Sequence, residues 1–222
     1  MLRFYYSPGA CSLAPHIVLE EIGLAYEEEI VSARPDADGL KTTSREWKAF
    51  NPKGRVPALA GVPGRIGGAD NLLTEANAIM IYLARSNPLA GLLPADPAAE
   101  ARCIEWLNWL TGSVHATAWA QVFRPYRFAA EEQCFPAIKA KGEEDLRTHF
   151  AYVDALLADG RDWAVPGGYS VVDPYLLVFY GWGKRIGWDM RGLYPAWTAH
   201  ADKVLARPAV RRIIAREGLT YY

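Results

Sequence analysis

The residue whose type and position point most directly to chemistry is Cys11. It follows a short apolar run, 2–6, and a Ser-Pro-Gly turn, and it lies at or just before the start of a helix-like segment. Unpaired N–H groups and the helix dipole favour an anion at a helix N-terminus, and the thiolate is the nucleophilic form of cysteine. The position predicts a reactive thiol; a small buried side chain is an equally good interpretation from position alone.

A helix N-terminus alone cannot activate Cys11 strongly. Lowering a cysteine pKa from about 8.5 to about 6.5 requires about 2.7 kcal/mol, whereas the N-terminus supplies roughly 0.3–1 kcal/mol and at most about 2. Other donors must contribute. No second cysteine stands three positions later, so a redox cycle at Cys11 needs an external thiol. Cys103 and Cys134 fall inside helical patterns, which favours structural roles for both.

Two further positions offer groups that bind ligands. Val56-Pro57 leads into a strand-like segment. A cis peptide there would direct the backbone N–H and C=O of Val56 toward a ligand, and a trans turn proline is the alternative. Thr74-Glu75 precedes a helix-like segment, where Glu75 either takes part in plain capping or pairs with an ammonium group of a ligand.

The histidines give a weaker signal. His115 lies two α-helical turns after Asn108, so the two share a helix face, and a histidine among aromatic residues is more often a core residue than a catalyst. His16, His149 and His200 have no His or Cys partner at metal-ligand spacing, so we expect no zinc site. The phosphate-binding glycine loops and the Gly-x-Ser-x-Gly elbow are absent from the sequence.

The elements that position these residues fall into two parts. The first part alternates between strands and helices, which predicts an α/β fold with a mixed sheet. We expect strands at 2–6 and 26–31, a helix from Leu13 that Gly23 stops, a hairpin of 56–59 with 72–73, and a helix at 74–85. The stretch from 32 to 49 is polar and poorly periodic. The hairpin connection, 61–70, is glycine-rich, which indicates an exposed and mobile loop.

The second part is predicted to be all-helical. Its apolar residues recur with a 3.6-residue period in three stripes: Ile104, Leu107, Leu110, Val114 and Ala118; Leu146, Phe150, Val153 and Leu157; Val204, Leu205, Val210 and Ile213. Ser170-Val171-Val172-Asp173 resembles a capping box that starts a buried helix. We therefore expect a domain at 1–86, a Pro- and Gly-rich linker at 87–97 and a helical domain at 98–222.

Composition narrows the function classes. The 222 residues carry 24 Lys and Arg against 25 Asp and Glu, so a formal charge of −1 offers no footprint for nucleic acid or anionic membranes. Three cysteines cannot build a disulfide framework. The first residues lack a signal-peptide core, and the apolar run at 175–182 is too short to span a bilayer. These features predict a soluble protein of a reducing cytoplasm.

Taken together, the motifs resemble the glutathione S-transferase superfamily, and specifically its bacterial beta class. The resemblance covers nearly the whole chain and rests on several motifs in the expected order. These are Tyr6-Ser7-Pro8-Gly9-Ala10-Cys11-Ser12-Leu13-Ala14-Pro15-His16, Asn51-Pro52-Lys53-Gly54-Arg55-Val56-Pro57-Ala58-Leu59, Leu73-Thr74-Glu75-Ala76 with Ala78-Ile79, Ile104-Glu105-Trp106-Leu107-Asn108, Val114-His115 and the Ser170–Asp173 box.

The resemblance implies a thioredoxin-like N-terminal domain that binds glutathione as co-substrate, an all-α C-terminal domain and a homodimer. We expect no metal, because the histidines have no partner at metal-ligand spacing. The resemblance implies a cis peptide before Pro57. It also implies roles for individual residues. Cys11 contacts the glutathione sulfur and can form a mixed disulfide with it, the Val56 backbone pairs with the cysteinyl unit, and Glu75 and the Ala76 N–H hold the γ-glutamyl end. Asn108 reaches across the dimer, His115 hydrogen-bonds near the thiol, and Tyr6 is a further glutathione-binding residue.

Two departures from the family pattern bear on activity. Lysine usually follows the histidine, where this chain has Ala116, so a cation beside the thiol is missing; Ala76 stands where Gly or Ser is usual. The first hypothesis is a transferase that conjugates glutathione to a small hydrophobic electrophile. The alternatives are a monothiol, glutathione-dependent disulfide reductase and a non-catalytic glutathione-binding protein. Four aromatic residues are candidates either for the wall of the electrophile pocket or for the helical core: Trp109, Trp119, Phe123 and Tyr126.

Overall fold

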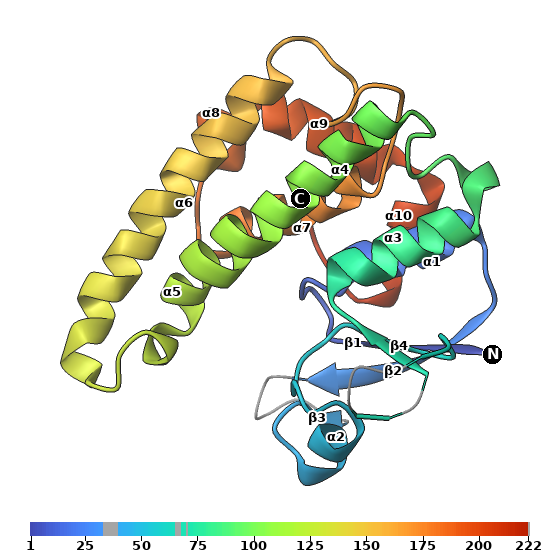
Figure 1. The fold of residues 1–222 in the computed structure, drawn as a ribbon. Coiled ribbons are helices and arrows are strands. Elements are labelled where there is room, and N and C mark those ends of the chain that lie inside the picture. The colour runs from blue at the N-terminus through green and yellow to red at the C-terminus, as the bar shows by residue number, and fades with distance from the viewer. Residues whose placement is uncertain (33–39, 65–67, 70, 222) are drawn as a thin grey trace.

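The computed structural model describes residues 1–32, 40–64, 68–69 and 71–221. A sheet with three helices forms the first part of the chain, and a bundle of helices forms the second (Figure 1). The elements of the first part are β1 (Leu2–Tyr6), α1 (Leu13–Ile22), β2 (Tyr26–Ser32), β3 (Leu40–Lys41), α2 (Arg45–Phe50), β4 (Ala58–Ala60), β5 (Leu72–Thr74) and α3 (Ala76–Ser86). The predicted fold class, α/β followed by all-α, is confirmed.

The sheet is mixed, with strand order β3-β2-β1-β4-β5. β1 pairs in parallel with β2 and antiparallel with β4, and β4 pairs antiparallel with β5, as the hairpin prediction requires. Side chains alternate across β1: Phe4 and Tyr6 join the large core that α1 and α3 cover, whereas Tyr5 packs with Trp47 of α2 on the other face. β1 is thus the central strand of the sheet, and its buried side chains join a core on each face. α1 and α3 lie on one side of the sheet and α2 on the other (Figure 1).

Two predictions for the first part need correction. The polar stretch from 32 to 49 contains β3 and α2, although no element was expected there. α2 is short and buries the single residue Trp47, so its sequence shows no apolar period. Ser44 caps the helix, because its side chain accepts a hydrogen bond from the Trp47 N–H at 3.1 Å. α3 begins at Ala76 because Thr74 still belongs to β5. Within the loop predicted to be mobile, 65–67 and 70 lie outside the described residues.

The second part contains the remaining helices. Its elements are η1 (Pro88–Ala90), α4 (Pro97–Trp109), η2 (Leu110–Trp119), α5 (Ala120–Phe123), η3 (Pro125–Arg127), η4 (Glu132–Cys134), α6 (Phe135–Leu157), α7 (Val172–Arg185), α8 (Met190–Leu193), α9 (Pro195–Ala206) and α10 (Pro208–Arg216). α1 packs against α7 and α10, so the two parts share a continuous core (Figure 1). No helix in the described part of the chain combines the length and the apolar character needed to cross a membrane.

The first predicted apolar stripe lies on two kinds of helix. Leu107, Leu110, Val114 and Ala118 are all buried, as predicted, but α4 ends at Trp109 and continues as a π-helix from Leu110. The hydrogen bonds of a π-helix run from i to i+5, which widens the turn and is frequent at functional sites. The two-turn relation between Asn108 and His115 therefore does not apply, because most of that interval is not α-helical.

The start of α7 is a buried polar cluster around Asp173. As in a capping box, Asp173 Oδ2 accepts a hydrogen bond from the Ser170 N–H at 2.7 Å. Ser170 Oγ accepts from the Val172 N–H at 3.3 Å rather than from the Asp173 N–H. Asp173 Oδ1 is 2.9 Å from the Ala164 N and 2.7 Å from His200 Nε2. Each carboxylate oxygen is thus satisfied, and the cluster anchors the helix in the core.

The helical part also holds the loop that precedes Cys11. Trp182 of α7 donates its indole N–H to the Gly9 carbonyl at 2.8 Å, and the Gly9 N–H donates to Glu217 at 2.8 Å. Glu217 in turn lies 2.7 Å from Nδ1 of the buried His16 in α1. Gly9 has φ +67°, and a Cβ there would meet Leu219 at 3.1 Å, so this clamp requires glycine.

Candidate active site

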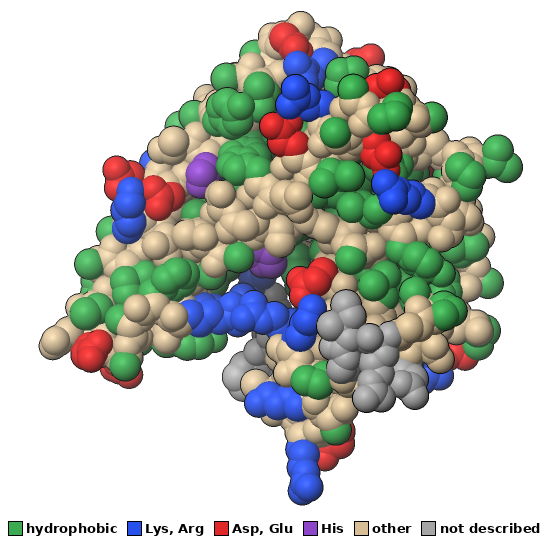
Figure 2. All heavy atoms as spheres, in the orientation of Figure 1, with side chains coloured by type: hydrophobic (Ala, Val, Ile, Leu, Met, Phe, Trp, Pro, Cys, Tyr) green, Lys and Arg blue, Asp and Glu red, His purple; other side chains and the backbone are tan. Residues whose placement is uncertain are grey.

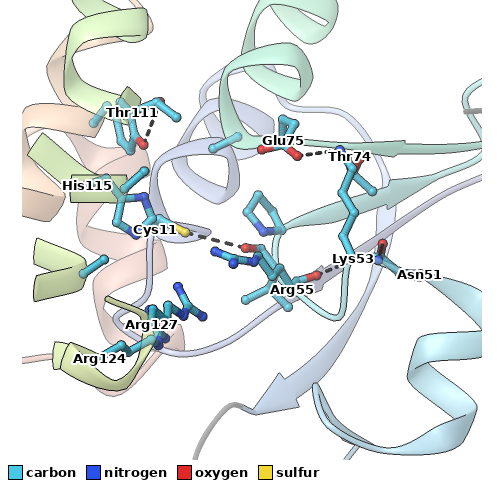
Figure 3. A pocket seen from close by; sticks show the side chains of 16 residues that line it. Cys11, Asn51, Lys53, Arg55, Thr74, Glu75, Thr111, His115, Arg124 and Arg127 are labelled. Carbon is cyan, nitrogen blue, oxygen red and sulfur yellow. Dashed lines mark hydrogen bonds and ion pairs between the residues drawn. The ribbon is translucent and has the colours of Figure 1, made fainter. Parts of the chain in front are cut away.

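A pocket between the two parts encloses about 650 Å³ of empty space, including the portion that opens to solvent. Loops at the ends of strands supply one wall, and the π-helix, α5, η3 and α7 supply the other. The first wall consists of Cys11, Asn51, Lys53, Arg55, Val56, Pro57, Thr74, Glu75 and Ala76; the second consists of Thr111, His115, Ala116, Ala120, Arg124, Arg127 and Tyr175 (Figure 3). Most of the predicted site residues meet here: Cys11, Val56, Pro57, Glu75, Ala76 and His115.

Cys11 lies in the pocket as a thiol. It is partly buried, and its S–H donates to the Val56 carbonyl with an S···O distance of 3.6 Å. Burial raises the pKa of Cys11 to about 11, and the nearby Arg124 guanidinium offsets this only in part. Of the two interpretations that the position left open, the raised pKa favours the buried, protonated thiol, because the cost of desolvating a thiolate exceeds what the neighbouring cations supply.

Val56 and Pro57 form the floor of the pocket beside Cys11. Their peptide bond is cis, as the resemblance implied, and the Val56 carbonyl points toward the Cys11 sulfur. Asn51 holds the preceding turn: its side-chain amide donates to the Arg55 carbonyl at 2.8 Å, and its oxygen accepts from the Lys53 N–H at 3.2 Å. The Val56 backbone is therefore fixed from both sides.

Glu75 lies across the pocket in an unusual backbone conformation. Its φ of +74° is outside the regions that non-glycine residues favour, which costs about 1–3 kcal/mol and is typical of functional positions. The side chain makes no capping hydrogen bond to α3; it is exposed and forms an ion pair with Lys53 at 2.5 Å. Glu75 thus offers a carboxylate to the pocket rather than a cap to the helix. The next residue, Ala76, is the buried first residue of α3.

His115 faces the pocket from the π-helix. Burial, together with the Arg124, Arg55 and Arg127 charges, lowers the pKa of His115 to about 4. The imidazole is therefore neutral near pH 7 and carries one N–H donor. Its ring also packs edge-on against Trp182 with centroids 5.2 Å apart. His115 is therefore both a pocket residue and part of the packed core, because one side of its ring faces the cavity and the other contacts Trp182.

Three arginines give the pocket a charge that the sequence did not predict. Arg124 and Arg127 enter together from the turn after α5, on the side of Cys11 away from Glu75, and Arg55 enters from the loop before β4 (Figure 3). Arg124 and Arg55 both lower the pKa of Cys11. Ala116 lines the pocket without a charge, so the expectation of a missing cation is corrected: cations are present, but from elsewhere in the chain. The sequence does contain a signal for these cations, because 124–127 reads Arg-Pro-Tyr-Arg and places two arginines at a helix end.

Two predicted residues lie outside this pocket. Tyr6 is buried in the core, where its ring stacks on Phe4 with centroids 6.0 Å apart. Burial raises the pKa of Tyr6 to about 12. Asn108 is exposed near the end of α4. Neither is among the residues that line the pocket, so their glutathione-binding roles stay predictions of the resemblance.

The four aromatic candidates do not line the pocket either. Trp119 is fully buried in the helical core, and Phe123 stacks on it with centroids 5.0 Å apart. Trp109 packs edge-on against Tyr152, away from Cys11, and Tyr126 is exposed. The aromatic groups that the described residues give to the second wall are therefore the Tyr175 ring and the His115 imidazole, and Arg124 and Arg127 carry its charge.

Comparisons with known proteins identify the family of this chain. A sequence model described as "Glutathione S-transferase, N-terminal domain" matches residues 9–86. The chain is 33% identical over 219 residues to glutathione S-transferase GstA of Escherichia coli O157:H7, which covers 98% of this chain and 100% of that protein. Among solved structures, a glutathione transferase homologue from Sulfitobacter with bound glutathione has a TM-score of 0.86, 31% identity and 99% coverage of both chains.

A bacterial beta class glutathione S-transferase from Sphingomonas chungbukensis is also similar, with a TM-score of 0.77, 30% identity and coverage of 98% of this chain and 100% of that one. The chain belongs to the glutathione S-transferase family, and its enzyme class is glutathione transferase. The family predicted from the sequence is confirmed, and so is the thioredoxin-like fold of its first part.

Proposed function

We propose that the pocket between the two parts binds reduced glutathione and presents its sulfur to a small electrophile. The observation that carries this proposal is the convergence of Cys11, Val56, Glu75, Ala76 and His115 on one cavity. Glutathione has two carboxylates, one ammonium group and one thiol. The pocket offers a carboxylate, backbone groups and cations that complement these charges.

The wall formed by the first part holds the peptide. Glu75 pairs with the ammonium group, the Ala76 N–H at the start of α3 receives the γ-glutamyl carboxylate, and the Val56 backbone pairs with the cysteinyl unit. When the Val56 carbonyl accepts a ligand N–H, the Cys11 S–H is released from its present acceptor. It then donates to the glutathione sulfur, which lies beside it.

The chemical step is a displacement by sulfur. The glutathione thiol loses its proton to solvent, and its thiolate forms a bond to the electrophilic carbon while the leaving group departs with its bonding electrons. The neutral His115 N–H, the Cys11 S–H and the arginines stabilise the thiolate, and the closed pocket brings both reactants together. His115 is a donor here and not the base, because its pKa of about 4 leaves it little affinity for a proton at pH 7.

Titration calorimetry with reduced glutathione tests the binding step. We expect micromolar to low-millimolar binding at one site per chain and at least tenfold weaker binding for Glu75→Ala. Glu105→Ala is the matched control, because Glu105 is an exposed carboxylate on α4 outside the pocket. Absence of binding at millimolar glutathione would overturn the proposal and leave a non-catalytic scaffold as the better hypothesis.

Disulfide reduction is the second candidate, because the Cys11 sulfur itself opens onto the pocket. Its thiolate would attack the glutathione sulfur of a glutathione-capped disulfide, forming a Cys11–glutathione disulfide and releasing the other thiolate. A second glutathione thiolate would then displace Cys11 and leave oxidised glutathione. The raised pKa of Cys11 makes this route slow at pH 7. Loss of reductase turnover in Cys11→Ala with retained conjugation assigns that activity to Cys11.

The remaining expectations also belong to this proposal. We place the domains at 1–86 and 98–222 with a linker between them, the protein in the cytoplasm, and two copies of the chain in a homodimer. The family relationship supports the dimer. Sedimentation equilibrium of the purified chain tests it, because a mass near twice 24.6 kDa is expected and a mass of a single chain would contradict it.

A further inference from the structure

We infer that the electrophile this enzyme accepts is an anion, and specifically a carboxylate-bearing molecule whose acid group binds Arg124 and Arg127. The inference rests on the proposed function and names the substrate class of the same pocket. It adds a negative charge to the small hydrophobic electrophile expected from the resemblance, because the wall that would contact the electrophile carries Arg124 and Arg127.

The pocket carries an excess of positive charge. Its lining includes four cationic side chains and one carboxylate, and that carboxylate, Glu75, is already paired with Lys53. In the part of the chain that the structure describes, Arg55, Arg124 and Arg127 have no carboxylate partner. Figure 2 shows Lys and Arg side chains gathered across the hollow between the two parts, below a histidine.

The arginines are held close to one another despite their repulsion. Burial lowers the pKa of Arg127, and the Arg124 and Arg55 charges lower it further. Burial is also the largest cause of the lowered pKa of His115, to which all three arginine charges add. Like charges gathered in a cleft raise the local concentration of an anion and bind it tightly when it arrives. An anionic ligand is the group that relieves this repulsion.

Glutathione does not use all of this charge. In its thiolate form it brings three negative charges and one positive charge, so one positive charge of the pocket remains uncompensated. The proposed contacts place its γ-glutamyl end at Glu75 and Ala76, across the pocket from Arg124 and Arg127 (Figure 3). These two arginines come from the wall formed by the helical part and lie on the other side of Cys11. They therefore face the position of the second substrate.

The chemistry of the side chains selects a carboxylate. A guanidinium group presents a planar fork of N–H donors that matches the two oxygens of a carboxylate. Thr111 and Tyr175 add hydroxyl groups to the same wall, joined by a 3.1 Å hydrogen bond. Phe and Trp side chains are absent among the described residues that line this pocket, and on the wall of the helical part Ala116, Ala120 and the Tyr175 ring offer the apolar contacts. These groups can hold the body of an acceptor whose acid group binds the arginines.

A matched pair of electrophiles tests the inference. 4-Chloro-3,5-dinitrobenzoate and 4-chloro-3,5-dinitrobenzamide have the same reacting carbon and the same leaving chloride, and they differ in charge. We would measure kcat/KM for each and divide it by the uncatalysed rate constant with glutathione. The expected preference for the carboxylate is at least about tenfold, and it is lost in Arg124→Gln and Arg127→Gln. Arg191→Gln, an exposed arginine of α8 outside the pocket, is the control.

A binding measurement separates failure of this inference from failure of the proposed function. 3,5-Dinitrobenzoate and 3,5-dinitrobenzamide lack the leaving group and can be titrated into protein saturated with S-methylglutathione. Tighter binding of the carboxylate, removed by Arg124→Gln and Arg127→Gln, supports the inference even if turnover is absent. Equal affinity for the two compounds overturns it. A similar loss of S-methylglutathione affinity in both variants also overturns it, because the arginines would then bind the peptide.

Discussion

Two regions of this molecule differ in how their charged side chains are partnered: in one the charge is fully hydrogen-bonded, and in the other like charges lie together without a carboxylate partner among the described residues. At the start of α7, Asp173 is fully buried, and hydrogen bonds from Ala164, Ser170 and His200 satisfy its oxygens. In the pocket, Arg55, Arg124 and Arg127 lie together without a carboxylate partner among the described residues. Satisfied hydrogen bonds stabilise the buried carboxylate, whereas an unpaired set of like charges costs stability, as the proposed anion site requires.

The largest expected effect is in the paired region. Asp173→Ala leaves several buried donors without an acceptor, so the free energy of unfolding should fall by about 3–5 kcal/mol. Denaturant unfolding monitored by tryptophan fluorescence measures the change. Asp202→Ala, at an exposed carboxylate 3.5 Å from Arg191, should cost less than about 1 kcal/mol. Equal losses for the two variants would show that the Asp173 cluster contributes no more than a surface pair.

The next effect is a pH dependence that comes from the pocket. The pKa of His115 is about 4 in the folded protein and about 6.5 in an unfolded chain, so the unfolded state binds more protons between these values. Stability should therefore fall by about 3 kcal/mol as pH decreases from 6.5 to 4. His115→Gln should remove this slope from the stability profile. A slope that persists in the variant would assign the acid sensitivity to another group.

A smaller effect concerns the reactivity of Cys11. With a pKa of about 11, its thiolate fraction should rise nearly tenfold per pH unit from pH 7 to 10. Iodoacetamide alkylation followed by mass spectrometry measures this rate, and Cys11→Ala identifies the modified site. Arg124→Gln should slow alkylation several-fold because the Arg124 charge lowers the pKa of Cys11. An inflection of the wild-type rate near pH 7 would contradict the expected pKa.

The smallest effect tests the backbone at Glu75. Glu75→Gly and Glu75→Ala both remove the carboxylate, but only glycine adopts a φ of +74° without steric cost. The glycine variant should be the more stable by about 1 kcal/mol, the reverse of the usual order in helices. Both variants should bind glutathione weakly. Thermal unfolding of the pair gives the comparison, and a more stable alanine variant would show that the strain is relieved locally.

How much the sequence predicted depends on how local each signal is. The strands β1 and β2, the hairpin, α1 and the apolar stripes were predictable because their periods and turn residues lie within a few residues of one another. The two-residue strand β3 was too short to show a period. α2 was not predictable, because it buries only Trp47 and has no periodic face. The π-helix was missed because the spacing of its buried residues also fits an α-helix.

The same distinction applies to the site. Cys11, Val56 and Glu75 lie in contiguous motifs, whereas Arg124 and Arg127 reach the pocket only through the packing of α5 and η3 against the rest of the bundle. Their proximity to Cys11 is a property of the tertiary structure. Burial of Cys11 is likewise tertiary, which is why a local argument about the helix N-terminus could not decide between a reactive thiol and a buried side chain.

The clamp on Gly9 has a consequence for exchanging parts between relatives. Trp182 and Glu217, both from the helical part, hold the carbonyl and the N–H of the residue two positions before Cys11. The N-terminal part supplies hydrogen bonds between Ser7 and Ser12 within this loop, but it does not shape the loop alone. A chimera that joins residues 1–86 to the helical half of another family member would retain the geometry around Cys11 only if the donor supplied an indole and a carboxylate at equivalent places. In this protein, the segment that carries the reactive cysteine and the set of residues that fixes its conformation are not the same stretch of chain.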